Sequence, residues 1–93
     1  MLALKKERGA MKISLGQYLA SIRADRHMTL REVEEATDKE VSNAYLSQIE
    51  NDKIQKPSPN VLHALSEIYG ISYEQLMEMA GYITTSWQNS NIF

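Results

Sequence analysis

The chain has 93 residues, of which 43% are hydrophobic and 24% are charged, a composition typical of one soluble globular domain. It contains no cysteine, which excludes a disulfide framework, a thiolate metal site and a cysteine nucleophile, and fits a reducing cytoplasm. No apolar run approaches the roughly 20 residues that cross a bilayer, and the first residues lack the apolar stretch of a secretion signal, so we expect no membrane association.

Charge is unevenly distributed along the chain. The net charge is −2, whereas nucleic-acid-binding domains are often basic. Residues 1–13 carry a charge of +3 and residues 14–57 carry −2, while residues 58–93 carry −3 and contain no Lys or Arg. We therefore expect any DNA-facing surface to lie in the first two thirds of the chain.

Five hydroxyl side chains mark the expected helix starts. A Ser or Thr accepts hydrogen bonds from the unpaired N–H groups of a first helical turn, and a Glu or Gln three residues later completes a capping box. An apolar pair in the staple positions flanks all five starts. The predicted boxes and single caps are Ser14–Gln17, Thr29–Glu32, Ser72–Gln75, Ser42, and Ser58 with Pro59 after it.

Apolar residues recur at helical spacing after each cap, and no segment shows the alternation of a strand. Gly70 and Gly81 stand where helix C-termini need a left-handed residue. The predicted fold class is therefore all-α. The predicted helices cover residues 15–26, 30–37, 43–50, 59–69 and 73–80.

The second and third predicted helices are short, and a brief connector at residues 38–41 joins them. This arrangement presents a recognition helix to the major groove of DNA. Leu46 and Ile49 define the buried side of the third helix, so its outer side carries small and amide side chains. Amides pair with adenine, and small side chains allow close approach to bases. An ordinary solvated face is the alternative interpretation.

Longer motifs favour a DNA-reading face over an ordinary solvated face. The segments LGQYLASIR, MTLREVEEAT, VSNAYLSQIEN and KPSPNVLHALSEIYGISYEQLMEMAGY, between Leu15 and Tyr82, resemble the helix-turn-helix domains of the Cro/C1 (XRE-type) repressor family. The pairing of VS-x-AYLSQIE with a downstream PSP-x-VL is the most specific part of this resemblance. The resemblance implies a compact five-helix, lambda-repressor-like DNA-binding domain, in which helices 2 and 3 form the helix-turn-helix.

The resemblance also implies roles for individual residues. Base contacts would come from the third helix, at Asn43, Ala44, Tyr45, Ser47 and Gln48. Phosphate contacts, which fix register, would come from the start of the second helix and the loop after the third, at Thr29, Arg31, Asn51, Lys53 and Lys56. Arg23 and Glu50 would form an ion pair between the first helix and the end of the third, where two separate surface charges are the alternative.

Two features depart from the family's pattern. Family members commonly have glycine directly after the second helix, whereas Asp38, Lys39 and Glu40 stand here and lengthen the turn. Acidic side chains also crowd the second helix, and any that faced phosphate would repel it. We expect Glu32 to be occupied by its capping box and the other acids to point sideways or outward.

The two ends are expected to flank a DNA-binding domain at residues 14–82. Residues 1–13 are predicted to be a flexible basic arm, which either contacts DNA or has no role. Residues 83–93 form a tail whose large apolar side chains fit either a dimer contact or packing on the same monomer. A symmetric homodimer would place two recognition helices about one turn of DNA apart.

The function that the sequence favours is a cytoplasmic, nucleoid-associated transcriptional regulator, of the repressor kind, that binds a near-palindromic operator as a homodimer. An enzyme is not expected, because His27 and His63 lie on different predicted elements and no metal or phosphate-binding motif is present. No cofactor or metal is expected either. The rival interpretation is a protein-interaction module, such as an antitoxin-like or anti-repressor protein, which the acidic second helix favours.

Overall fold

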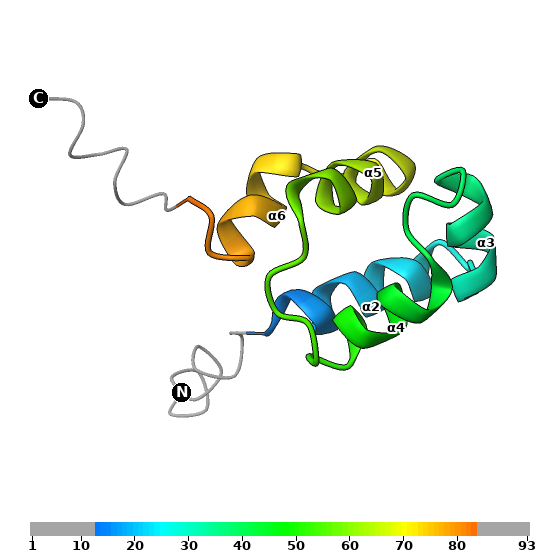
Figure 1. The fold of residues 1–93 in the computed structure, drawn as a ribbon, viewed down its shortest axis with the longest axis horizontal. Helices are drawn as coiled ribbons and strands as arrows, with labels where there is room; N and C mark the ends of the chain where they lie inside the picture. The colour runs from blue at the N-terminus through cyan, green and yellow to red at the C-terminus, as the bar shows by residue number, and fades with distance from the viewer. Residues whose placement is uncertain (1–12, 84–93) are drawn as a thin grey trace, which may run out of the picture.

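The computed structural model describes residues 13–83, which form five helices and no strand. The helices are α2 (Leu15–Asp25), α3 (Leu30–Ala36), α4 (Asn43–Glu50), α5 (Pro59–Tyr69) and α6 (Tyr73–Met79) (Figure 1). The all-α prediction is confirmed, and each helix begins where its cap predicted. None of the helices in this range is long and apolar enough to cross a membrane. All but the last residue of the predicted basic arm and all but the first residue of the predicted tail lie outside the described residues.

Hydroxyl caps begin all five helices, because each cap side chain accepts from a backbone N–H of the first turn. The capping boxes at Ser14 and Thr29 are complete, with both reciprocal hydrogen bonds. At Ser72 only one half of the predicted box forms, from Gln75 N to the Ser72 hydroxyl. Ser72 has ψ 122°, against 164° at Ser14 and 166° at Thr29, and this rotation changes the direction of its N–H relative to the helix.

Glycines end the two C-terminal helices as predicted. Gly70 caps α5 with φ 70°, and Gly81 follows the end of α6 with φ 91°. Glycine adopts this left-handed conformation without the steric cost that a Cβ brings. Arg26, just after α2, donates to the Tyr69 carbonyl at 2.7 Å. A cation thus binds one of the last carbonyls of α5, which have no partner within the helix.

The core gathers one apolar stripe from each helix. Burial of each such side chain contributes about 1.5–3 kcal/mol, so this core dominates the stability of the domain. Leu30 and Ile68 pack against it while remaining partly exposed. Its fully buried aliphatic members are Leu19, Val33, Val41, Leu46, Ile49, Leu62, Leu65 and Leu76.

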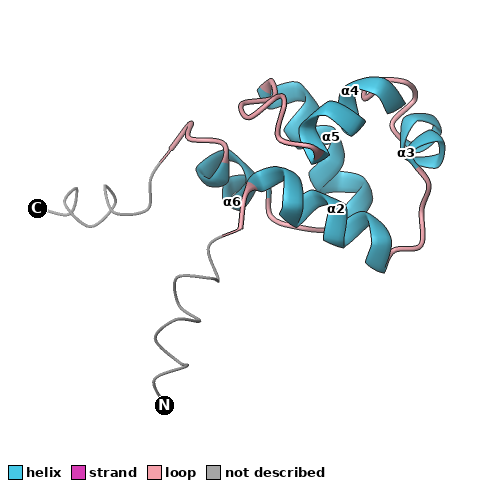
Figure 2. Ribbon diagram, turned by 90° about the horizontal axis from the view of Figure 1, so that it is seen from below, coloured by secondary structure: helices cyan, strands magenta, loops and turns pink. Residues whose placement is uncertain are grey.

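The helices pack so that α4 is held between two neighbours. It contacts both α2 and α3, while α5 and α6 pack against each other. In two perpendicular views α3 lies at one end of the molecule and α6 at the other, together with the first and last described residues (Figures 1 and 2). This arrangement places the surface of α3 and α4 away from the points where the described chain begins and ends.

Candidate nucleic-acid interface

Thr37 connects the end of α3 to the start of α4. Its buried hydroxyl donates to the Val33 carbonyl at 2.9 Å and accepts from the backbone N–H of Val41 at 3.2 Å. Val41 itself is fully buried. The turn between the two helices is therefore tied to the core at both of its ends.

The lengthened turn closes through two left-handed residues, Asp38 and Lys39, with φ 57° and 66°. The N–H of Lys39 donates to the Glu34 carbonyl at 2.7 Å, so the chain folds back over the last turn of α3. A side chain with a Cβ pays a steric cost in this conformation, and glycine does not. Asp38 and Lys39 therefore adopt, without being glycine, the left-handed conformation that glycine adopts most readily.

The outer face of α4 carries the side chains predicted to read bases. Leu46 and Ile49 are fully buried, which confirms the predicted inner face. Ala44 and Gln48 are exposed, and Tyr45 and Ser47 are half-buried. A helix with a small residue and an amide on its exposed face can enter a major groove and pair with base edges.

Asn43, the first residue of α4, is bound by an acid that the sequence did not connect with it. Glu34 Oε1 accepts from the Asn43 side-chain Nδ2 at 2.6 Å and from its backbone N–H at 3.2 Å. These two hydrogen bonds lower the pKa of the Glu34 carboxyl below its ordinary value, and Arg31 and Lys39 contribute to the same shift. The predicted base contact Asn43 is therefore half-buried and already partnered on one side.

The remaining acids of this region take the places expected of them or face solvent. Glu32 Oε1 accepts from the backbone N–H of Thr29 at 2.8 Å, which confirms that its capping box occupies it. Glu35, Asp38 and Glu40 are exposed. The acidic character of α3 is thus divided between a cap, the Asn43 contact and solvated side chains.

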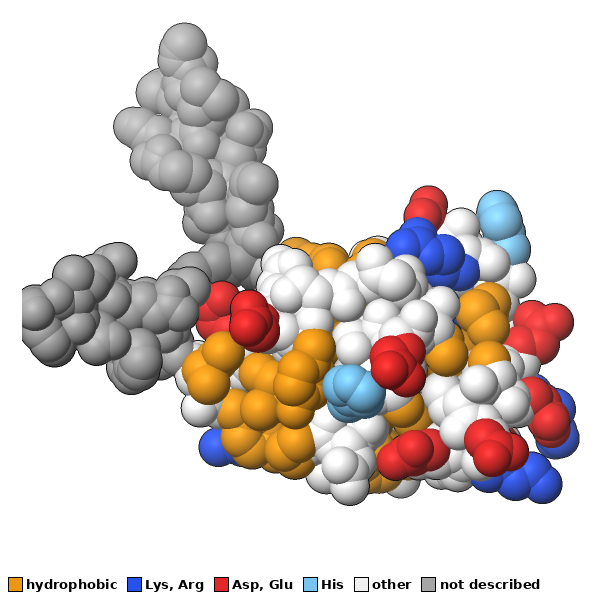
Figure 3. Space-filling model, turned by 90° about the horizontal axis from the view of Figure 1, so that it is seen from above, with side chains coloured by type: hydrophobic (Ala, Val, Ile, Leu, Met, Phe, Trp, Pro, Cys, Tyr) orange, Lys and Arg blue, Asp and Glu red, His pale blue; other side chains and the backbone are white. Residues whose placement is uncertain are grey.

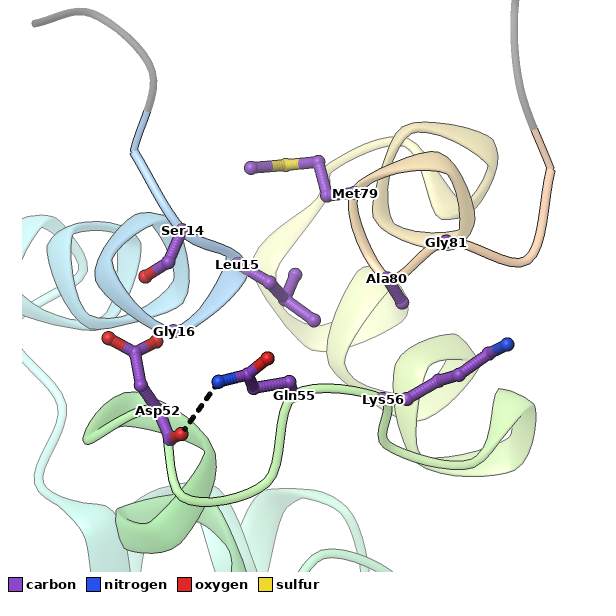
Figure 4. A pocket seen from close by; sticks show the side chains of 9 residues that line it. All are labelled: Ser14, Leu15, Gly16, Asp52, Gln55, Lys56, Met79, Ala80 and Gly81. Carbon is purple, nitrogen blue, oxygen red and sulfur yellow. Dashed lines mark hydrogen bonds between the residues drawn. The ribbon is translucent and has the colours of Figure 1, made fainter.

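The predicted phosphate contacts lie at the start of α3 and in the loop after α4, and their surroundings differ. Thr29 and Arg31 are exposed at the start of α3, and Lys53 is exposed after α4. Asn51 is exposed, but its Nδ2 donates to the Ser47 carbonyl at 2.8 Å and so caps the end of α4. Lys56 lines a pocket together with Ala80 and Gly81 at the end of α6 (Figure 4), and its Nζ is 4.6 Å from the centre of the Tyr82 ring.

Arg23 and Glu50 form the internal ion pair that the resemblance implied. Nε and Nη2 of Arg23 each donate to one Glu50 carboxylate oxygen at 2.8 Å, a bidentate arrangement. The Glu50 side chain is 8% exposed and that of Arg23 24%. The hydrogen bond to Glu50 raises the pKa of Arg23. Because Arg23 Nη1 also donates to the Met28 carbonyl at 3.0 Å, one guanidinium joins α2, the α2–α3 loop and α4.

Gly16 sets the distance between α2 and the end of α4, which the sequence did not indicate. A Cβ at this position would overlap the Ile49 carbonyl oxygen and lie 2.8 Å from Asp52 Oδ1. Gly16 and Asp52 lie next to each other in the lining of a pocket between the start of α2, the α4–α5 loop and the end of α6 (Figure 4). A glycine early in a predicted helix, where helix propensity disfavours it, was the only signal in the sequence.

The described residues offer no metal centre. Between residues 13 and 83, no group of three or more His, Asp or Glu side chains is arranged to hold a metal ion. The two histidines have different surroundings. His63 packs edge-on against Tyr73, whereas His27 lies in the α2–α3 loop with φ 57°.

Comparison with known proteins agrees with this geometry. Residues 19–76 match the family model described as helix-turn-helix. The chain is 41% identical over 70 residues to the HTH-type transcriptional repressor RghR of Bacillus subtilis, which covers 75% of this chain and 50% of that protein. It is 35% identical over 68 residues to the uncharacterized HTH-type transcriptional regulator RghRB of the same organism. This match covers 73% of this chain and 48% of that protein.

The chain spans about half the length of these curated relatives. No solved structure matches it. The family model covers well over half of the chain, from within α2 to within α6, and includes both helices of the candidate interface. The chain therefore belongs to the helix-turn-helix family, of the Cro/C1 (XRE) type that its motifs resemble.

Proposed function

We propose that this protein is a sequence-specific DNA-binding transcriptional repressor that reads a near-palindromic operator through α4. The observation that carries the proposal is the exposed, acid-free face of α4, with Ala44 and Gln48 outward, on a helix anchored from two sides by Arg23 and Thr37. The names of its relatives, a transcriptional repressor and a transcriptional regulator, support the same function.

In this proposal one face of α4 carries sequence information and the flanking residues fix the position of the helix. Residues 14–82 act as the DNA-binding domain. Two copies bind as a homodimer, since two recognition helices about one helical turn apart match a near-palindromic site. The base contacts are Asn43, Ala44, Tyr45, Ser47 and Gln48, and the phosphate contacts are Thr29, Arg31, Asn51, Lys53 and Lys56.

A second candidate function is a protein-interaction module, and one surface favours it. Residues 58–83 contain Glu67, Glu74 and Glu78 but no Lys or Arg. Seen from above, the molecule shows acidic and apolar side chains, with Lys and Arg toward the edges of the view (Figure 3). Such a surface repels phosphate and fits a protein partner better than DNA. The two functions are compatible if they use different faces.

Binding to fragments of genomic DNA tests the proposal. The wild-type chain and the double variant Asn43→Ala with Gln48→Ala are compared across a salt series. We expect the wild type to select a near-palindromic site and the variant to lose that selection, because each base contact contributes on the order of 1–3 kcal/mol. Binding that depends steeply on salt without any sequence preference would reduce the interaction to phosphate attraction. No binding at low salt would leave the protein-interaction module as the better function.

A further inference from the structure

The contact between Glu34 and Asn43 has a chemical consequence for DNA reading. A side-chain amide has a donor end and an acceptor end, and a base distinguishes between them. Glu34 is a carboxylate that only accepts hydrogen bonds, and its Oε1 is 2.6 Å from Asn43 Nδ2. Rotating the amide by half a turn would place Oδ1 against a negatively charged oxygen. The carboxylate therefore permits one orientation of the amide and opposes the other.

The permitted orientation leaves suitable groups for a base. One amide hydrogen is committed to Glu34, while Oδ1 accepts no hydrogen bond within the described residues and is not fully buried. Oδ1 and the second amide hydrogen are the pair that Asn uses in bidentate contact with adenine N6 and N7. Glu34 also accepts from the Asn43 backbone N–H, which fixes the first turn of α4 from which the side chain extends.

We propose that Glu34 is a positioning residue that determines base preference, because it holds the Asn43 amide with Oδ1 and one N–H available to a base. The inference rests on the proposed function, in which Asn43 reads DNA. It assigns a role in specificity to an acid on α3. An acid near DNA would otherwise be expected only to repel phosphate. The contact also spans the lengthened turn, so that α3 directly positions the start of α4 despite the two left-handed residues between them.

The test is Glu34→Gln, which keeps the shape of the side chain and changes its chemistry. A Gln has both a donor and an acceptor, so it can pair with either orientation of the Asn43 amide. Glu35→Gln is the matched control, because Glu35 is the next residue on α3, is exposed and loses the same charge. Relative affinities for single-base variants of the selected site are measured for both variants, for Asn43→Ala, and for Glu34→Gln combined with Asn43→Ala.

We expect wild type and Glu35→Gln to prefer one base about 5-fold to 150-fold at the position where Asn43→Ala loses its preference. Glu34→Gln loses most of that preference at this position alone, and has no further effect on it when Asn43 is already Ala. A general effect of charge on DNA affinity would change all site variants equally and cancel in these ratios. In the free protein, the Asn43 side-chain amide signals in a ¹⁵N–¹H spectrum shift in Glu34→Gln and stay in place in Glu35→Gln.

The inference is overturned if Glu34→Gln keeps the wild-type preference, if Glu35→Gln loses it equally, or if Asn43→Ala changes no base preference. The first two results leave the proposed function unchanged, and the third removes only Asn43 from its base contacts, because the wild type still selects a site. A wild type that prefers no sequence overturns the proposed function itself and this inference with it. The wild-type measurement alone thus separates the two failures.

Discussion

A double-mutant cycle on Arg23 and Glu50 tests whether this pair anchors the recognition helix. Replacing Arg23 by Leu leaves a carboxylate that is 8% exposed without its two donors. Leaving a fully buried charge without its partner costs about 3–5 kcal/mol. Because Arg23 is 24% exposed and solvent can enter its place, we expect about 2–4 kcal/mol for Arg23→Leu. Glu50→Leu costs about 1–3 kcal/mol, since the guanidinium is more exposed and keeps its bond to the Met28 carbonyl.

The double variant removes both charges and leaves neither unpaired. Apolar replacement of a buried pair is often close to neutral, so the double variant is expected to cost less than the sum of the single variants by at least about 2 kcal/mol. The free energy of unfolding of all four proteins is measured by urea denaturation, followed by circular dichroism at the helix band. Glu50→Gln is included as well, because a loss of about 4 kcal/mol approaches the total stability of a small domain.

Additivity of the two substitutions within about 0.5 kcal/mol would refute this reasoning, because independent sites behave in that way. The guanidinium and the carboxylate would then be two separately solvated charges. A coupling of the expected size would instead assign the lost stability to this pair. If the free energy of unfolding also falls with urea concentration at the wild-type slope, a change in the denatured chain is excluded as the cause.

Three further predictions concern backbone strain and burial. Gly16→Ala should destabilise the fold by about 1–3 kcal/mol, although alanine is the better helix former, because α2 must move away from the Ile49 carbonyl; an equal or higher melting temperature would contradict this close approach. Lys39→Gly should stabilise the fold by up to about 1 kcal/mol, because glycine adopts φ 66° without steric cost, and a lower urea midpoint would argue against a strained turn. The Tyr69 hydroxyl is buried without a hydrogen-bond partner among the described residues, and burial raises the pKa of Tyr69 to about 12. In the unfolded chain Tyr69 ionises near pH 10, so its titration does not affect stability below pH 10 and lowers the stability of the fold by about 3 kcal/mol as the pH rises from 10 to about 12. Tyr69→Phe should therefore match or exceed the wild type at pH 7 and lose less stability between pH 10 and 12; parallel pH profiles would disprove the assignment.

The sequence by itself determined the helices and the face of α4. Hydroxyl caps and glycines act through hydrogen bonds within a few residues, so Ser14, Thr29 and Gly70 could be recognised without any tertiary information. The inner face of α4 also followed from spacing alone, because Leu46 and Ile49 fall on one side of any α-helix. The half-formed box at Ser72 was the exception, because the backbone rotation at the cap is not encoded in the residue types.

Contacts between distant residues were decided by the tertiary structure. The bond between Glu34 and Asn43 depends on the path of a turn with two left-handed residues, which the residue types Asp38 and Lys39 do not predict. The need for Gly16 arises only when α2 meets the Ile49 carbonyl, a steric condition set by helix packing. Local hydrogen bonding and apolar spacing therefore determined where the recognition helix begins and which side it exposes, whereas the path of the α3–α4 turn determined how its first side chain is held.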